Sequence, residues 1–341
     1  MIGPRTRMIL QRFLSAIPAL AGVLVLIFLL LRVLPGDPAA LFAASPSATA
    51  ADVTELRQQL RLDRPLPEQL GLYLWDMTRG DFGRSLMTGR AVADDLWDRL
   101  PATLELVSLS FVVSLVTALA LGITAALRPD SLIDHGVRIL CTIWVTLPAF
   151  VTGLLLVFVF YYLAGWAPAP TGRLDLFAIV PPTVTGFILI DTLLVRDLET
   201  FVSAVSQLVL PILTLTIATV PPLARVTRAS MISAMSSDFI RTARALGLPR
   251  RQIVLTYGLR NAILPVLTIL GTTVAGLLGG SIVVEKVFAW PGISAYAMDA
   301  LLSSDYAPVQ GFVVLVCGVY LFVNLLIDIL SGLSDPRVSL S

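Results

Sequence analysis

The sequence predicts an all-α polytopic membrane protein with six transmembrane helices and with both termini in the cytoplasm. The first support is composition. Of the 341 residues, 56% are hydrophobic and only 14% are charged, whereas a soluble domain carries roughly 25% charged residues. Much of the surface is therefore expected to face lipid. A net charge of +1 argues against nucleic-acid binding, which needs a basic face. Cys141 and Cys317 lie far apart in apolar runs and are interpreted as small buried hydrophobes.

The second support is the set of charge-free stretches, because crossing a bilayer takes about 20 apolar residues. A stretch at residues 176–190 is short and carries Pro181 and Pro182 near its middle, where a helix would lose hydrogen bonds that lipid cannot replace. It is predicted to be a connecting or re-entrant segment. The first long stretch exceeds the roughly 7 to 15 residues of a signal-peptide core, which favours an uncleaved helix. The six predicted spans are residues 13–31, 106–127, 139–172, 200–224, 261–284 and 306–327.

The distribution of arginines predicts the orientation. Arg5, Arg7 and Arg12 precede the first span, and residues 225–260 hold seven arginines against one acid, Asp238. Both regions are expected in the cytoplasm by the positive-inside rule, and six spans place them on one side, whereas seven would separate them. The predicted organisation is an N-terminal tail with the first helix at 1–33, an extracytoplasmic helical segment at 34–101, a transmembrane core of helices two to six at 102–331, and a cytoplasmic tail at 332–341.

The sequence shows no motif that is typical of catalysis, metal binding or nucleotide binding. His135 is the single histidine, so an HExxH zinc site is excluded, and it is interpreted as a surface loop residue. Lys286 is the single lysine and belongs to no P-loop, so energy from ATP would have to come from another chain. Glu105 and Asp328 lie near predicted interfaces, whereas a proton-coupled carrier is expected to hold ionisable groups near the midplane. A membrane enzyme and a stand-alone secondary transporter are thus disfavoured, the second without being eliminated.

The most informative polar stretch is a predicted cytoplasmic helix over residues 238–246. Ser237 or Asp238 can cap its start, Gly247 suits the left-handed position after its end, and Pro249 stops it. Pro249 is also favoured at a first helical position, which predicts a second short helix running to residue 255.

The predicted helix places Phe239, Ala243 and Leu246 on one face, with Arg241 and Arg244 elsewhere. A helix this short is marginal in water and needs something to pack on. Pattern alone favours packing of the apolar face against the protein's own membrane helices. The alternative is a helix that lies in a groove of a cytoplasmic partner.

This region also carries a family resemblance. Residues 238–248, followed by 259–266, resemble the EAA loop of binding-protein-dependent ABC importer permeases, specifically the first permease of dipeptide and oligopeptide systems. Segments along the whole chain agree in order, namely residues 34–38, 80–83, 101–106, 185–192, 290–292 and 324–328. The resemblance implies the MetI-like type I ABC importer permease fold, with the permease core at 102–331 and the EAA coupling loop at about 226–260.

The resemblance implies a multi-pass protein of the bacterial inner membrane that forms half of a pathway for di- or oligopeptides. Its implied partners are a second homologous permease, two ABC ATPase subunits and an extracytoplasmic substrate-binding protein. ATP and magnesium would be held by the ATPases, and this chain would bind no cofactor. Similar permeases carry glutathione or nickel, which leaves the substrate open; residues 185–192 look more like the dipeptide and glutathione types. The coupling residues implied by the resemblance are Asp238, Phe239, Arg241, Thr242, Ala243, Arg244, Ala245, Leu246 and Gly247.

The sequence departs from the general EAA pattern in two places. The Glu-Ala-Ala falls on Arg241, Thr242 and Ala243, and the later Ile-x-Leu-Pro falls on a segment that ends at Arg260. The acid of the motif therefore has no counterpart at Arg241, whose basic side chain is expected to meet acids on the ATPase.

The predicted outer segment contains two amphipathic patterns. Residues 49–52 look like a capping box, followed by an apolar face at Val53, Leu56 and Leu60. A similar face recurs at Leu70, Tyr73, Leu74 and Met77. These patterns predict short helices over the pathway mouth, available to a binding protein, or alternatively a self-packed cap with no partner.

Overall fold

The computed structural model describes residues 17–30 and 63–334, and these residues are almost entirely helical. The chain forms two compact units. Unit 1 comprises Met1–Pro101 and Gly292–Leu321, and unit 2 comprises Ala102–Pro291 and Phe322–Ser341. Two long helices, α5 (Val92–Ala126) and α14 (Tyr306–Ser334), contribute to both units.

Unit 1 packs short helices around aromatic side chains. Besides the ends of α5 and α14, its described helices are Ile17–Leu30, α4 (Leu66–Thr78) and α13 (Ile293–Leu302). Phe28 and Tyr73 stack with ring centroids 5.5 Å apart, and Leu70, Leu74 and Met77 pack around them. The amphipathic helix predicted at 70–77 is confirmed by this cluster. The capping box at 49–52 and its apolar face lie outside the described residues.

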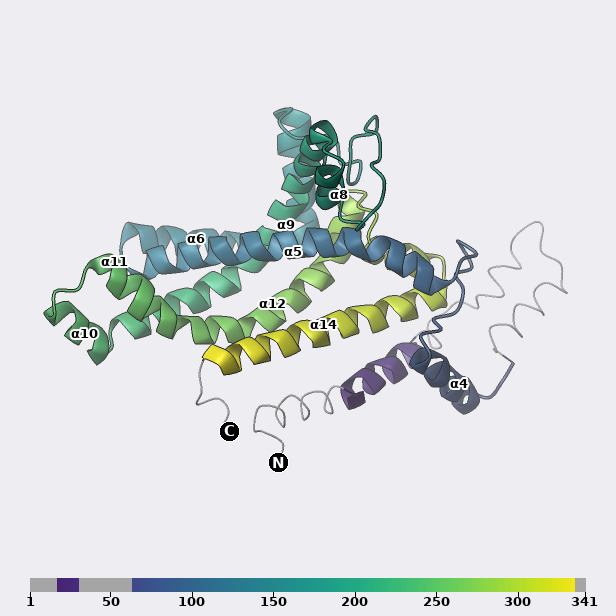
Figure 1. Cartoon of the computed structure of the whole chain (residues 1–341), viewed down its shortest axis with the longest axis horizontal. Helices are drawn as coiled ribbons and strands as arrows, with labels where there is room; N and C mark the ends of the chain where they lie inside the picture. The colour runs from purple at the N-terminus through teal and green to yellow at the C-terminus, as the bar shows by residue number, and fades with distance from the viewer. Residues whose placement is uncertain (1–16, 31–62, 335–341) are drawn as a thin grey trace. The chain divides into compact units, whose positions relative to one another are not determined.

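Unit 2 is organised around the long helix α9 (Leu198–Met235), which is labelled in Figure 1 and packs against several other helices of the unit. Its core combines residues of α5, α6, α9 and α12, including Cys141, which is buried as predicted, whereas Cys317 in unit 1 is only half-buried. The other elements of this unit are α6 (Leu132–Thr146), α7 (Ala149–Leu156), η1 (Val157–Leu163), α8 (Ile188–Leu194), α10 (Asp238–Ala245), α11 (Arg250–Gln252), η2 (Ile253–Leu259) and α12 (Arg260–Val287), where η1 and η2 are single π-helical turns.

Four helices among the described residues are long and apolar enough to cross a membrane: Val92–Ala126, Leu198–Met235, Arg250–Val287 and Tyr306–Ile327. A fifth span requires α6 and the α7–η1 helix together, and these are bent by 102°. The stretch predicted as a span at 139–172 is therefore not one continuous helix. The break lies at Leu147, which is extended because the following Pro148 disfavours helical backbone at the residue before it. Residues 175–187 form no helix, which confirms that this stretch is a connection.

Two glycines allow helices of unit 2 to approach each other closely. A Cβ added at Gly122 of α5 would lie 2.6 Å from the Cβ of Thr227 on α9, and one added at Gly271 of α12 would lie within contact distance of the Asn324 amide oxygen on α14. Small residues at such crossings let membrane helices gain van der Waals contact. Nearby, the hydroxyls of Ser114 and Thr219 are hydrogen bonded at 2.7 Å, which joins α5 to α9.

A buried ion pair joins α6 to α9 near the α5–α6 turn. Asp134 has no exposed surface, and its carboxylate accepts hydrogen bonds from both Nε and Nη2 of Arg228, at 2.6 and 2.5 Å. The backbone N–H of Asp130 adds a third bond at 3.0 Å. His135 follows on the exposed side of α6 rather than in a loop, because Ser131 caps the helix and starts it before the histidine.

Candidate functional site

The α10 helix forms where the sequence predicts it, over Asp238–Ala245. Gly247 has a φ of +73°, and an added Cβ there would meet no atom within 4 Å. Its N–H donates to the carbonyl of Arg244 at 3.0 Å, and the N–H of Leu248 donates to the carbonyl of Ala243 at 3.2 Å. These two bonds form a Schellman motif, which requires a left-handed residue at this position. Glycine is therefore needed for backbone conformation rather than for space.

The start of α10 differs from the prediction. Ser237 occupies the N-cap position, but no side chain caps the helix. Its hydroxyl instead donates to the carbonyl of Ala234 at 2.5 Å and so satisfies the end of α9. Pro249 precedes the next helix rather than opening it, and the short helix predicted to reach residue 255 continues through η2 into α12.

The packed face of α10 is not the predicted one. Ile240 and Ala243 are the buried pair, at 0% and 4% exposure, and they pack with Ile253 of η2. Phe239 is 43% exposed and Leu246 is 74% exposed. The predicted face is split because small Ala243 permits close contact with η2 on the side shared with Ile240. Burying the Ile240 side chain stabilises this packing by about 1.5–3 kcal/mol.

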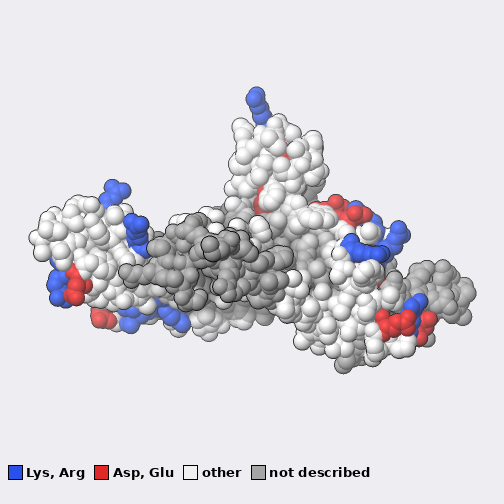
Figure 2. Space-filling model, turned by 60° about the horizontal axis from the view of Figure 1, so that its bottom comes forward, with Lys and Arg blue, Asp and Glu red and all other residues white. Residues whose placement is uncertain are grey.

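We define the outward face of α10 as five of the exposed residues on the helix and at its C-cap: Phe239, Arg241, Thr242, Ala245 and Leu246. Arg241 and Asp238 form an exposed ion pair of 3.3 Å one turn apart, which contributes little to stability. Figure 2 shows basic side chains over the end of unit 2 that carries α10 and α11. This face therefore offers two apolar contacts among cationic groups, an arrangement suited to a partner surface with an apolar cleft and acidic residues.

The outward face is connected to two long helices through short, tightly packed contacts. Met235 at the end of α9 packs against the Ile240 cluster, and its sulfur would lie 3.0 Å from a Cβ added at Gly258 of η2. Because η2 leads directly into α12, α10 packs against segments that belong to or continue into α9 and α12. The π-helical turn lies at this junction, as such turns often do at functional sites.

The exposed side of α12 differs from an ordinary lipid-facing surface. Its exposed residues between 261 and 279 are all polar or small, whereas α7 and η1 expose large side chains such as Phe150, Leu154 and Phe158. Sequence reasoning missed this face, although its spacing of three, four and seven residues was readable as a helical stripe. We call it the α12 polar face; it comprises Asn261, Pro265, Thr268, Thr272, Ala275, Gly276 and Gly279.

A buried network holds the loop before α8. The Glu105 carboxylate accepts a hydrogen bond from Arg173 Nη2 at 2.6 Å and another from the backbone N–H of Leu189 at 2.9 Å. Arg173 also donates to the carbonyl of Gly186 at 2.8 Å. Glu105 is thus buried, and its carboxylate accepts hydrogen bonds from the free N–H groups at the start of α8. The side chain of Asp328 lies outside the described residues.

Asp191 organises the turn within the resembling segment 185–192. Its carboxylate accepts hydrogen bonds from the N–H and hydroxyl of Thr185, at 2.8 and 2.7 Å, and from the N–H of Gly186 at 3.0 Å. Burial raises the pKa of Asp191, but these bonds outweigh burial, so the net pKa is lowered. The segment is thus explained by its own folding, without reference to a ligand.

Comparison with known proteins gives consistent matches. The model of the family described as "Binding-protein-dependent transport system inner membrane component" matches residues 118–340, and a model of the N-terminal part of such membrane components matches residues 5–107. The probable D,D-dipeptide transport system permease protein DdpB of Escherichia coli K12 is 41% identical over 328 residues, 96% of each chain. The di/tripeptide permease protein DppB of Pseudomonas aeruginosa is 38% identical over 97% of this chain and 98% of its own. The dipeptide permease protein DppB of E. coli K12 is 34% identical over the same shares.

Proposed function

Because the chain belongs to the family of binding-protein-dependent transport system inner membrane components, we propose that it forms half of a peptide pathway and is driven through α10. The family makes the chain a permease subunit of an ABC importer in the inner membrane, and it is not itself catalytic. ATPase and substrate-binding partners follow from that membership.

The observation that carries the proposal is the two-sided character of α10. Ile240 and Ala243 fasten the helix to its own chain, while Phe239 and Leu246 remain exposed beside arginines. One apolar pair thus packs inward, and the exposure of the other pair supports contact with a partner. We assign the outward face to a cleft of the ATPase subunit, with Arg241 meeting acids there.

The nine proposed coupling residues then have different tasks. Ala243 anchors the helix and Gly247 ends it, whereas Asp238, Phe239, Arg241, Thr242, Ala245 and Leu246 are exposed for contact. Arg244 is also exposed, and it lines a pocket described below. ATP and magnesium remain on the ATPases, and closure of the two ATPases moves α10 and, through η2 and the end of α9, the long helices.

We propose that the α12 polar face lines the pathway or meets the second homologous permease. A membrane helix that exposes hydroxyl groups and glycines is better matched to water or to a close partner helix than to lipid. This assignment is consistent with the proposed topology of six spans. In that topology both termini and the coupling loop at 226–260 lie in the cytoplasm. Residues 34–101 form the outer segment, and residues 102–331 form the permease core. Two further partners belong to the proposal: a second homologous permease completes the pathway within the membrane, and an extracytoplasmic substrate-binding protein delivers the cargo at the outer face.

The substrate is proposed to be a di- or oligopeptide. Its support is that the relatives described above are named for dipeptide or di/tripeptide transport. Glutathione and nickel remain the alternatives within this class, and a stand-alone secondary transporter is the alternative outside it. The polar face of α12 carries no ionisable side chain from residue 261 to 279, which suits cargo of low net charge.

The proposal is tested by uptake into proteoliposomes that contain both permeases, the ATPases and the binding protein. Gly247→Val strains the left-handed turn and is expected to abolish ATP-dependent peptide uptake while membrane abundance stays normal. Gly136→Val, at an exposed helical glycine with no neighbour within 4 Å, is the matched control and should retain uptake. Full uptake by the Gly247 variant would refute coupling through α10. Gradient-driven uptake without ATPases would instead support a secondary transporter.

A further inference from the structure

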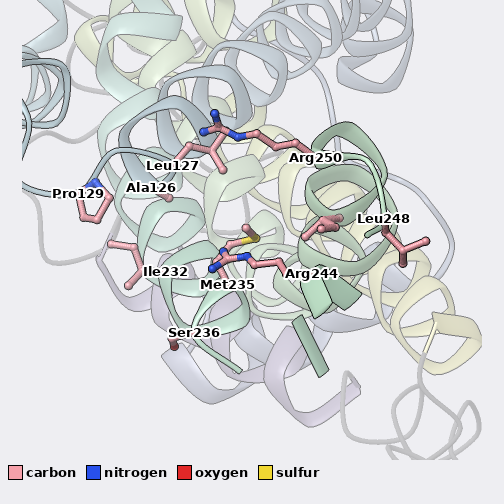
Figure 3. Close-up of a pocket in the computed structure, with 10 residues that line it drawn as sticks. Ala126, Leu127, Pro129, Ile232, Met235, Ser236, Arg244, Leu248 and Arg250 are labelled. Atoms are coloured by element: carbon pink, nitrogen blue, oxygen red, sulfur yellow. The ribbon is translucent and has the colours of Figure 1, made fainter. Parts of the chain in front are cut away.

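A pocket of about 620 Å³ lies beside α10, between the ends of α5 and α9. Seven of its ten lining residues are apolar, and the polar ones are Ser236, Arg244 and Arg250. Figure 3 shows both arginine side chains extending from the α10–α11 segment, that of Arg250 toward Leu127 and that of Arg244 toward Met235. The pocket therefore combines an apolar wall with two cationic groups.

The two arginines lack a compensating charge within the described part of the chain. Neither Arg244 nor Arg250 forms an ion pair with a residue that the structure describes. Two acids on the neighbouring elements are already engaged, because Asp134 pairs with Arg228 and Asp238 pairs with Arg241. An anion bound in the pocket would supply a counter-charge to both guanidinium groups.

The level of the pocket relative to the membrane surface indicates which anions can reach it. Ala126 and Leu127 end the charge-free stretch of α5, and Arg128 follows, so this wall lies at the boundary between hydrocarbon and water. Phospholipid phosphates lie at that level, and basic pockets between membrane helices bind anionic headgroups. The apolar wall suits the adjoining acyl chains, which a free phosphate would lack.

We propose that this pocket binds the phosphate headgroup of an anionic phospholipid, with Arg244 and Arg250 as its cationic ligands. Arginine suits this task because its planar fork donates paired hydrogen bonds to phosphate oxygens. Since Arg244 lies on α10 itself, a bound lipid would hold α10 against the ends of α5 and α9. This inference does not require that α10 contacts an ATPase.

The test is native mass spectrometry of the purified full chain, exchanged into nanodiscs that contain phosphatidylglycerol or only phosphatidylcholine. Wild-type protein is expected to retain phosphatidylglycerol selectively. The double variant Arg244→Gln/Arg250→Gln should bind it roughly 30-fold more weakly, from two lost charged contacts. The matched control, Arg241→Gln/Arg251→Gln, removes the same charge from the same loop without touching the pocket lining.

Several outcomes would overturn the proposal. Equal loss in the test and control variants would mean that the loop attracts anionic lipid only through its total charge. Unchanged binding in Arg244→Gln/Arg250→Gln would remove the site altogether. Calorimetric titration with inorganic phosphate in phosphatidylcholine nanodiscs separates the sources: arginine-dependent phosphate binding without lipid retention would assign a soluble anion instead.

One further variant and two further measurements keep the test informative. Arg244→Lys/Arg250→Lys preserves charge and should retain most lipid binding, even if the glutamine pair folds poorly. Unchanged lipid retention together with loss of ATPase co-purification in Arg244→Gln/Arg250→Gln would assign the pocket to the ATPase and refute the lipid site. Failure of peptide uptake in proteoliposomes, with lipid retention intact, would refute only the proposed function.

Discussion

The Asp134–Arg228 pair should contribute to the free energy of unfolding mainly because each charge prevents the other from being buried without a counter-charge. Asp134 is fully buried and accepts two bonds from Arg228, whose side chain is 23% exposed. Asp134→Asn keeps the volume but leaves the guanidinium without its counter-charge. Removing one partner of a buried pair costs about 3–5 kcal/mol, and the partial exposure of Arg228 places the expected loss near the lower end, about 3 kcal/mol.

The matched double variant is Asp134→Leu/Arg228→Met, which replaces both charges by apolar groups. An apolar pair of similar volume is often neutral or stabilising relative to a buried ion pair, so the double variant should unfold with a free energy close to that of the wild type. The assay is reversible denaturant unfolding of the purified chain in detergent micelles, with the single variants measured in parallel. Additive losses, with the double variant as unstable as the two single variants combined, would refute the reasoning.

Three further predictions concern other helices and the loop before α8. Gly271→Val should lower the unfolding free energy by about 1–3 kcal/mol because the new side chain displaces Asn324, whereas Gly276→Val, with no neighbour within 4 Å, should do much less; thermal unfolding compares them. The lowered pKa of Asp191 stabilises the loop above the ordinary aspartate pKa of about 3.9, and this contribution is lost as pH falls through the lower folded value. The protection of the Gly186 N–H against hydrogen exchange, relative to the intrinsic exchange rate at each pH, should therefore fall at acid pH in the wild type and be low at every pH in Asp191→Asn; pH-independent protection in the wild type would contradict this. Thr272→Cys on the α12 polar face should react with a water-soluble thiol reagent, and buried Thr273→Cys should not; equal rates would remove the pathway assignment.

Much of the fold follows from the sequence because it depends on local signals. Charge-free stretches predict the long apolar helices α5, α9, α12 and α14, since a hydrophobic run has few stable alternatives in a bilayer. Gly247 predicts the end of α10 for an equally local reason, because the left-handed turn needs glycine.

The parts that failed depend on contacts distant in sequence. The buried face of α10 is chosen by Ile253, which the helical pattern of residues 238–246 does not contain. The burial of Glu105 was also not predicted, because it depends on Arg173 and on backbone N–H groups more than 80 residues away. The pairing of Asp134 with Arg228 was equally invisible, because each charge has polar neighbours in its own segment.

The most direct test of the central claim, that the outward face of α10 contacts the ATPase, is cysteine cross-linking in the assembled transporter. Phe239→Cys and Leu246→Cys place thiols on the outward face, and Ile240→Cys places one on the buried face as the control. The account predicts cross-links to the ATPase subunit from residues 239 and 246, with yields that change when ATP binds, and none from residue 240. Cross-links confined to residue 240, or none from the outward face in a complex that retains ATP-driven uptake, would contradict it.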